Sequence, residues 1–403
     1  MDKTDIPGTF NAGATLGPVN ETNMARIWNK HKQSNTPLKR KVFVAMSGGV
    51  DSSVAAALLQ KEGYEVAGAH MLCWDGCENN GDKQDAMSVA AKLGIRFFTF
   101  DFRKEYRAAV YDYMVREYAA GRTPNPDVMC NKTIKFGIFL DRALEMGFDY
   151  IATGHYAQKE MKLLGMRVGV GAPVERVKTR AGREVSALRV ARDTSKDQSY
   201  FLWTLTQGQL RHSLFPIGNY LKSEVRELAR KFDLPTAEKK DSQGLCFVGK
   251  VDFGEFLREA IPQKQGVVVD SGGKKIGEHD GAHFYTLGQR HGLNIGGEAL
   301  PLYIAEKRAD TNTLVVARGD TDPILYRKEL IAENLNWIFG EQEFPLKCFA
   351  RIRYRQPLQH CTLNTASSTP DVIFDLPQRA ISSGQSIVFY TDSGEMLGGG
   401  IIK

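Results

Sequence analysis

The sequence predicts an α/β fold: a doubly wound parallel sheet, followed by a small central α+β domain and a C-terminal β-barrel. Between residues 41 and about 155, short apolar runs alternate with segments of helical periodicity, which is typical of a parallel sheet with crossover helices. From about Gly266 onward, short β-rich runs are separated by glycine, proline and aspartate turns, which indicates a small all-β barrel or sandwich. The 403 residues are enough for two or three domains.

The first domain is expected at residues 41–212, with a polar insert at 158–188 that is either a loop or a hairpin. Apolar runs predict strands at 42–46, 66–72, 96–100 and 150–152. Periodicity predicts helices at 83–93, 106–119 and 134–146, and an apolar helix in the second half of 191–205. Ligands of such sheets bind at the carboxyl ends of the strands, where the turns at 47–49 and 153–155 lie.

The central domain is expected at residues 213–282 and the barrel at 283–403. A helix within 215–232 has one apolar face, made of Leu221, Val225, Leu228, Ala229 and Phe232. Its basic residues Lys222, Arg226, Arg230 and Lys231 indicate either a solvated surface or a phosphate-binding helix. Later strands are expected at 267–269, 283–287, 314–317, 348–354, 372–374 and 387–390.

The composition, 42% hydrophobic and 25% charged, is that of a globular protein, and no apolar run is long enough to cross a membrane. A net charge of +6 permits an RNA partner without requiring one. Six cysteines in so long a chain favour a reducing compartment over a disulfide scaffold. The acidic residues of segment 1–40 fit neither a signal peptide nor a mitochondrial presequence. We expect a mobile leader and a cytoplasmic protein of bacterial type, with the mitochondrion as the alternative.

The clearest motif is Ser47-Gly48-Gly49, which joins an apolar strand to a helix. Two glycines let the backbone turn sharply and approach a ligand. Asp51, Ser52 and Ser53 follow and are expected to cap the helix, whose N–H groups suit a phosphate. The motif differs from the P-loop G-x-x-x-x-G-K-[ST]. The alternative is an ordinary strand–turn–helix corner.

Two cysteines lie in unusual loops. Cys130 follows the stiff stretch RTPNPDVM, and a nearby lysine or helix start would lower its thiol pKa and make it a better nucleophile. The alternative is a small buried cysteine in a capped turn. Cys246 lies in DSQGLCFVG, a loop of small and polar residues that can admit a bulky partner.

The chain shows, in order, SGGVDSS, GRTPNPDVMCNK, TGHYA, SKDQSYFL, DSQGLCFVG, YTLGQR with GLNIGG, and RIRYRQP. From about Val42 to Ile402 these motifs resemble the tRNA-specific 2-thiouridylases of the MnmA type, in the PP-loop ATP pyrophosphatase superfamily. The resemblance implies ATP-dependent adenylation of the 2-oxo oxygen of the wobble uridine in tRNAs for lysine, glutamate and glutamine. Sulfur transfer from a cysteine persulfide would follow, giving 2-thiouridine, AMP and pyrophosphate.

The resemblance also implies roles for particular residues. ATP, with Mg²⁺ on its phosphates, would be bound by Ala45, Met46, Ser47, Gly48, Gly49, Val50, Asp51, Ser52, Met71 and Gly154. Cys246 would carry the persulfide received from a donor protein, and Cys130 would attack it. Asp127 would act as a general acid or base, and Asn125, Pro126 and Asp127 would contact the flipped-out uridine. The positions matching tRNA contacts are Lys196, Asp197, Gln198, Arg353 and Tyr354.

The alternation in Arg351–Arg355 agrees with a tRNA-facing strand that has its three arginines on one face. Cys73 and Cys77, in LCWDGC, depart from the family pattern. We expect no metal there; an iron–sulfur cluster and a redox-sensitive pair are the alternatives. Two other functions stay open: a different PP-loop ATP pyrophosphatase, such as an adenylating ligase, and a non-catalytic RNA-binding protein.

Overall fold

The computed structural model describes residues 39–75, 81–164, 183–241, 253–293, 295–297, 299–364 and 369–403. Nearly all of the predicted leader, Cys77, the middle of the 158–188 insert and Cys246 lie outside these residues. Arg40–Lys403 forms one compact unit. None of the described helices combines the length and the apolarity that a membrane crossing requires.

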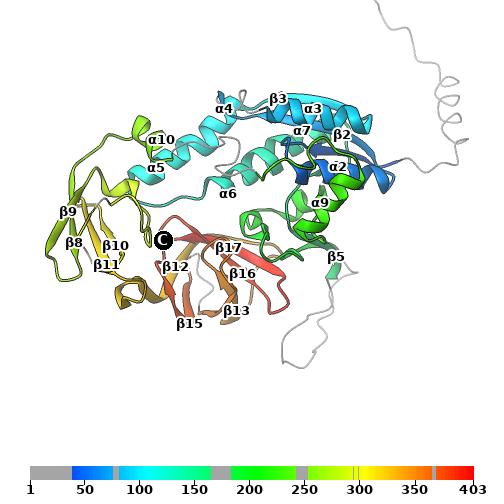
Figure 1. Ribbon diagram of the computed structural model, residues 1–403. Coiled ribbons are helices and arrows are strands. Elements are labelled where there is room, and N and C mark those ends of the chain that lie inside the picture. The colour runs from blue at the N-terminus through cyan, green and yellow to red at the C-terminus, as the bar shows by residue number, and fades with distance from the viewer. Residues whose placement is uncertain are drawn as a thin grey trace, which may run out of the picture. The chain divides into compact units, whose positions relative to one another are not determined.

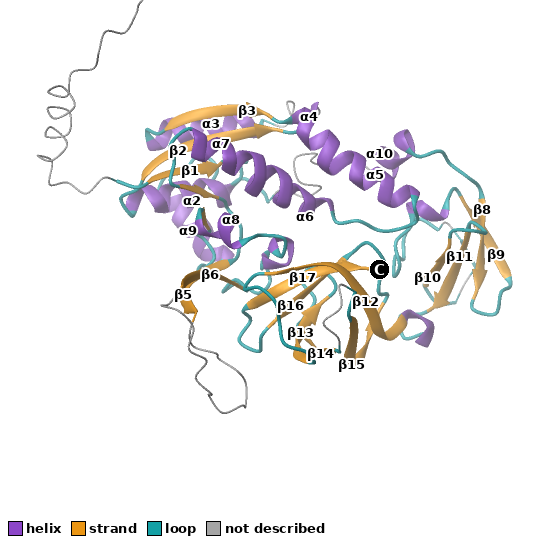
Figure 2. Ribbon diagram, turned by 180° about the vertical axis from the view of Figure 1, so that it is seen from behind, coloured by secondary structure: helices purple, strands orange, loops and turns teal. Residues whose placement is uncertain are grey.

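A five-stranded parallel sheet forms the first domain, as predicted, in the order β3-β2-β1-β4-β7. Its strands are β1 (Lys41–Ala45), β2 (Glu65–Leu72), β3 (Arg96–Asp101), β4 (Tyr150–Ala152) and β7 (Ser213–Leu214). Helices lie on both faces (Figure 1, Figure 2). Alternate residues of β1 therefore enter two separate cores: Phe43 packs in one, Val42 and Val44 in the other. This doubly wound arrangement confirms the predicted fold class.

The helices of this domain lie close to the predicted spans. They are α2 (Val50–Lys61), α3 (Asp82–Leu93), α4 (Arg103–Tyr106), η2 (Arg107–Tyr111), α5 (Asp112–Ala119), α6 (Pro126–Cys130), η3 (Asn131–Ile138) and α7 (Phe139–Glu145). Both η2 and η3 are wide π-helical turns, which are rare and occur often near functional sites. The η3 turn begins directly after Cys130.

The 158–188 insert contains an antiparallel hairpin, β5 (Gln158–Leu164) with β6 (Arg183–Arg189). The helix predicted in the second half of 191–205 is wrong, because only the short 3₁₀ turn η4 (Ser199–Leu202) forms there. Long-range hydrogen bonds replace the helical ones: the amide of Asn336 donates to the carbonyls of Trp203 and Leu205. The helices α8 (Gln207–Arg211) and α9 (Lys222–Lys231) follow, and α9 buries Val225 and Ala229 as its apolar face predicts.

A second sheet has the order β10-β11-β8-β9. It follows α10 (Phe253–Ala260) and contains β8 (Gly266–Asp270), β9 (Lys275–His279), β10 (Leu302–Arg308) and β11 (Thr313–Arg318). The strand predicted at 283–287 is wrong, since the 3₁₀ turn η5 (Ala282–Phe284) and further turns occupy that stretch. Because one sheet contains strands on both sides of residue 282, we propose a domain boundary near 319–325 instead.

The C-terminal domain is a closed barrel in the order β12-β15-β14-β13-β16-β17. After the 3₁₀ turn η6 (Pro323–Leu325), its strands are β12 (Tyr326–Trp337), β13 (Leu346–Arg351), β14 (Gln359–Leu363), β15 (Asp371–Arg379), β16 (Ser386–Tyr390) and β17 (Met396–Ile402). The last strand, β17, closes the barrel by pairing with both β12 and β16. Gly399 of β17 faces a tryptophan of the first domain, since a Cβ there would lie 2.7 Å from Cγ of Trp203.

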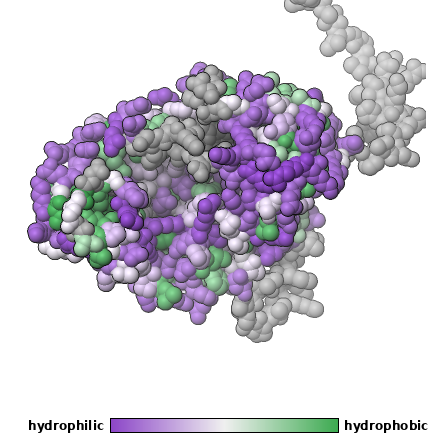
Figure 3. Space-filling model, viewed as in Figure 1, coloured by the Kyte–Doolittle hydropathy of each residue, from purple (hydrophilic) through white to green (hydrophobic). Residues whose placement is uncertain are grey.

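The strand predicted at 348–354 is wrong beyond Arg351, where β13 ends. Residues 352–355 form a turn, and Arg355 has a φ of +64°. The three arginines therefore do not share one face: Arg351 is buried, Arg353 is partly buried and Arg355 is exposed. Much of the surface in the view of Figure 3 is hydrophilic, with apolar residues in scattered patches.

Candidate functional site at the nucleotide loop and the thiol helix

The turn after β1 requires glycine at one position for two separate reasons. Gly48 has a φ of +79°, and a Cβ there would lie 2.1 Å from the carbonyl oxygen of Asp82. The predicted capping role of Asp51, Ser52 and Ser53 is wrong, because the N-cap is Gly49 and these residues lie in the first turn of α2. The hydroxyls of Ser52 and Ser53 instead donate to the Gly49 carbonyl, at 3.1 and 2.8 Å, and brace the turn.

The second turn, 153–155, packs directly against this helix start. A Cβ on Gly154 would lie 2.7 Å from the backbone nitrogen of Ser52 and 2.8 Å from the carbonyl carbon of Asp51. The two turns thus meet between β1 and β4, which is where the strand order reverses direction. This is the position at which open α/β sheets bind ligands. The first N–H groups of α2 have no partner within the helix, so the backbone here fits a phosphate group.

Within the predicted ATP loop, most side chains face inward. Five of the predicted ATP-binding residues have buried side chains: Ala45, Met46, Val50, Ser52 and, near the end of β2, Met71. They can therefore contact a nucleotide mainly through their backbone groups or by supporting the loop from below. The side chains of Ser47 and Asp51 reach solvent. The surface that this loop offers a ligand is therefore made of backbone groups, one hydroxyl and one carboxylate.

A lysine that the sequence analysis did not assign to the site pairs with that carboxylate. The ammonium of Lys222, the first residue of α9, lies 2.7 and 2.9 Å from the two carboxylate oxygens of Asp51. The Tyr156 hydroxyl also donates to Asp51, at 2.9 Å, and burial together with this carboxylate raises the pKa of Tyr156. Only 14% of the Lys222 side chain is exposed. The first residue of α9 therefore lies beside the helix that follows the glycine turn, as a phosphate-binding role of α9 would require.

Lys222 also bonds Asp241, at 2.9 Å, and Asp241 in turn accepts from Lys196 at 3.0 Å and from Arg226 at 2.6 Å. Burial alone would raise the pKa of the Asp241 carboxyl, but the bonds from Lys222 and Lys196 outweigh burial and lower it. The four residues Asp51, Lys222, Asp241 and Lys196 form a chain of alternating charges. This chain connects the predicted ATP loop with a residue predicted to contact tRNA.

The loop before Cys130 is held from two sides. The side chain of Asn125 caps α6 by accepting from the Val128 N–H at 3.3 Å, with Pro126 in the first turn. From the barrel, the Gln385 amide donates to the carbonyls of Thr123 and Pro124, at 3.0 and 3.1 Å. The residues at 125–127 that are predicted to contact the base are therefore held in place by the helix cap and by the barrel.

Cys130 itself is fully buried, 0% exposed, while Asp127 is partly exposed. The buried-cysteine alternative thus describes the environment of Cys130 in this structure. Cys246 lies outside the described residues, so the predicted meeting of the two thiols stays a prediction.

The five predicted tRNA-contact residues differ in exposure. Asp197 is 1% exposed, whereas Lys196 and Gln198 on either side of it are partly exposed. The carboxylate of Asp197 is therefore not available to contact RNA. The guanidinium of Arg353 donates to the carbonyls of Leu287 and Ala380, at 3.2 and 2.7 Å, and burial together with nearby Arg379 lowers its pKa.

Tyr354 lies beside another partly buried aromatic residue. Its ring centroid is 4.7 Å from that of Phe201, and the guanidinium carbon of Arg355 lies 4.9 Å from the Tyr354 ring. Aromatic rings flanked by a guanidinium are suited to stacking on an unpaired base. Tyr354 of the barrel domain and Phe201 of η4 thus lie side by side, and their rings form a surface suited to such stacking.

Cys73 is buried directly after β2, and Cys77 lies outside the described residues. Within the described ranges, no group of three or more histidine, cysteine, aspartate or glutamate side chains is arranged to hold a metal ion. The expectation that Cys73 and Cys77 bind no metal stays a prediction.

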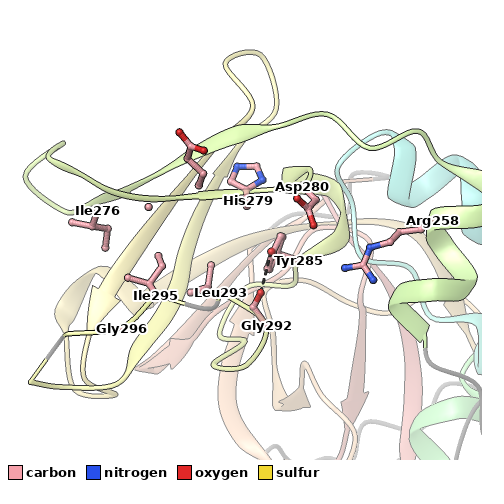
Figure 4. Close-up of a pocket in the computed structure, with 11 residues that line it drawn as sticks. Arg258, Ile276, His279, Asp280, Tyr285, Gly292, Leu293, Ile295 and Gly296 are labelled. Atoms are coloured by element: carbon pink, nitrogen blue, oxygen red, sulfur yellow. Dashed lines mark hydrogen bonds between the residues drawn. The ribbon is translucent and has the colours of Figure 1, made fainter.

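A pocket of about 400 Å³ lies in the second sheet domain (Figure 4). Arg258, Asp280 and Tyr285 line it, and none of the predicted site residues that the structure describes does. His279 also lines it, but both of its ring nitrogens are occupied: Nδ1 accepts from the Gly281 N–H at 3.0 Å, and Nε2 lies 3.1 Å from the Asn312 carbonyl. Burial lowers the pKa of His279. The pocket is therefore separate from the nucleotide loop.

Family comparisons cover almost the whole described chain. Residues 40–250 match the model of the tRNA methyl transferase HUP domain, 254–318 the tRNA methyl transferase PRC-barrel domain, and 327–402 the aminomethyltransferase beta-barrel domain. The gap between the second and third matches includes the boundary near 319–325 that we propose from the sheets.

Curated relatives match over nearly their full length. The tRNA-specific 2-thiouridylase MnmA 2 of Geobacillus kaustophilus is 45% identical over 377 residues, which are 92% of this chain and 96% of that protein. The tRNA-specific 2-thiouridylase MnmA of Acinetobacter baumannii is 43% identical over 381 residues, 91% of this chain and 97% of that one. Each of the three family models matches a single segment, whereas these relatives match more than nine-tenths of the chain. The chain belongs to the family of tRNA-specific 2-thiouridylases.

Proposed function

We propose that this protein is a tRNA 2-thiouridylase that uses ATP to exchange the 2-oxo oxygen of a wobble uridine for sulfur. The observation that carries the proposal is the junction of the two glycine turns at the switch point of the sheet. From there the Asp51–Lys222–Asp241–Lys196 chain leads to a predicted tRNA contact. Family membership supplies the reaction class. An adenylating ligase would need the turns but not the contacts on the RNA side.

ATP would be held by Ala45–Ser52, Met71 and Gly154, with Mg²⁺ on its phosphates. Its chemical contribution is an AMP group on the uridine oxygen, which converts a poor leaving group into a good one. Gly48 and Gly154 let the backbone of the two turns pack against Asp82 and the first turn of α2, which would fix the N–H groups offered to the phosphates. Lys222, which is held between Asp51 and Asp241, would be the cation available to the phosphates.

The sulfur step uses two thiols. The Cys130 thiolate attacks the Cys246 sulfur, the persulfide S–S bond breaks, and a Cys130–Cys246 disulfide forms as hydrosulfide leaves. Hydrosulfide attacks carbon 2 of the adenylated uridine, and AMP departs with the former oxygen. A dithiol reductant then returns the disulfide to two thiols. Because Cys130 is fully buried in this structure, the step requires a rearrangement that exposes its sulfur.

The partners follow from the same proposal. The tRNAs for lysine, glutamate and glutamine would bind across 196–198 and 353–354, with the target base placed at Asn125–Asp127. A persulfide-bearing protein would load Cys246. We place the reaction in the bacterial cytoplasm, where thiols stay reduced.

The test incubates the protein with unmodified tRNA, ATP–Mg²⁺ and a persulfide donor, and measures 2-thiouridine by mass spectrometry of the digested RNA. The wild type should form 2-thiouridine and AMP in equal amounts. Cys246→Ser should stop thiolation but still consume ATP in the presence of tRNA, and Cys130→Ser should also stop it. Cys361→Ala, which removes a thiol from inside the barrel, is the control and should retain thiolation. Full thiolation by Cys246→Ser would refute the persulfide role.

A further inference from the structure

A buried ion pair joins the two segments that match tRNA contacts. The guanidinium Nη1 of Arg351 donates to Oδ2 of Asp197 at 2.8 Å. The side chains are 7% and 1% exposed. Asp197 is the middle residue of 196–198, and Arg351 ends β13 two residues before Arg353. The pair therefore links the nucleotide-loop domain to the barrel at the point where each is expected to face tRNA.

The surroundings of the pair leave the carboxylate fully occupied. Oδ1 of Asp197 accepts from the backbone N–H groups of Ala191 and Ser199, at 2.9 and 3.1 Å. Oδ2 accepts from the Ser199 hydroxyl at 3.0 Å as well as from Arg351. The Ser199 hydroxyl lies 3.0 Å from that of Tyr390, whose ring centroid is 4.9 Å from the guanidinium carbon of Arg351. Four side chains from two domains thus form a closed ring.

This ring is an inefficient way to gain stability. Among the described residues, nothing accepts a hydrogen bond from the Nε of Arg351, although this atom is buried. An unpaired buried donor and two desolvated charges both carry a cost that an apolar contact of similar size would avoid. What the ion pair provides and an apolar contact lacks is a fixed direction and distance.

We propose that Arg351 and Asp197 are positioning residues for tRNA, which set Lys196 and Gln198 in register with Arg353 and Tyr354. This inference rests on the proposed function. Both charges are hidden from solvent, so they act through the flanking residues and touch no phosphate themselves. Without the pair, the two segments can still bind RNA, but not as one surface with fixed spacing.

The test compares Arg351→Met, Asp197→Asn and the double variant with the wild type, in the full-length protein. Asparagine removes the charge but keeps an oxygen that can accept from the N–H groups of Ala191 and Ser199. Each single variant leaves one buried charge without its partner and should unfold at a lower temperature. The double variant removes both charges and should recover much of the lost thermal stability. Its KM for tRNA should nevertheless be raised on the order of tenfold, with kcat unchanged. A double variant with wild-type KM would overturn the proposal, because the pair would then be merely structural.

The salt dependence of tRNA binding separates positioning from direct contact. Lys196→Gln is the matched comparison and should reduce the slope of log affinity against log salt by about 1, as loss of a phosphate contact does. The Arg351 and Asp197 variants should weaken binding at an unchanged slope. A reduced slope in Arg351→Met would show that Arg351 contacts phosphate and would overturn the proposal. If the wild type binds tRNA without forming 2-thiouridine, the proposed function fails, while these binding measurements still judge the pair.

Discussion

Replacing Gly154 by alanine tests whether the two glycine turns form the nucleotide site. The added Cβ would lie 2.7 Å from the Ser52 nitrogen, against 3.4 Å for ordinary contact, so something must move by 0.7 Å. The opposing atoms are backbone of the first turn of α2, so no rotamer change can absorb this overlap. We expect a loss of about 1–3 kcal/mol in the free energy of unfolding. A displacement approaching 1 Å can lower catalysis by about 10²-fold.

The assay is tRNA-dependent pyrophosphate release at varied ATP concentration. Gly154→Ala should lower kcat/KM for ATP by roughly 10- to 100-fold while tRNA affinity stays unchanged. The control is Gly208→Ala, where the added Cβ would lie 3.8 Å from the Thr206 hydroxyl, an ordinary contact in helix α8. This control should gain about 0.5–1 kcal/mol of stability and keep full activity. Equal kcat/KM values for ATP in the two variants would refute the assignment of the nucleotide site to the switch point between β1 and β4.

Three further perturbations follow from the site. Gly48→Ala should lower the free energy of unfolding by more than the roughly 1–2 kcal/mol that a left-handed alanine costs, because its Cβ would also clash with Asp82. Gly63→Ala is the control, since it has a positive φ but open space around it and so shows the backbone cost alone. Equal unfolding temperatures of the two variants would contradict the predicted clash. Lys222→Met should move the midpoint of acid unfolding to higher pH. The lowered pKa of Asp241 stabilises the fold above about pH 3.9, and without Lys222 the Asp241 carboxylate loses a partner that lowers this pKa. An unchanged midpoint by circular dichroism would count against this role of Lys222. Tyr200→Phe should cost about 1 kcal/mol in chemical denaturation by removing the bond to the Ser386 carbonyl.

The sheet, and the edge at which its two glycine turns meet, were predictable because the signals are local. A five-residue apolar run predicted a strand at 42–46, and β1 covers Lys41–Ala45. The glycine pair at 48–49 predicted a sharp turn, and Gly48 adopts a left-handed φ of +79° there. Strand–helix alternation then decided which ends meet, since parallel strands place their carboxyl ends at one edge.

What the sequence concealed depends on contacts distant in the chain. The alternation of Arg351–Arg355 predicted a strand, but the Arg353 guanidinium bonds carbonyls from two other segments and the chain turns there. The sequence shows Lys222 as one of several basic residues of α9. Its ion pairs with Asp51, 171 residues earlier, and with Asp241 distinguish it from the exposed Lys231. Side-chain periodicity records which face is apolar, not which polar residue finds a partner.

The strand that closes the barrel is also the last of its six strands to be synthesised. Without β17, β12 and β16 each have an unpaired edge, and Trp203 lacks its contact with Gly399. The barrel therefore cannot close before β17 has been synthesised. A truncation upstream of Met396 would leave both strand edges open, and unpaired strand edges are templates for aggregation.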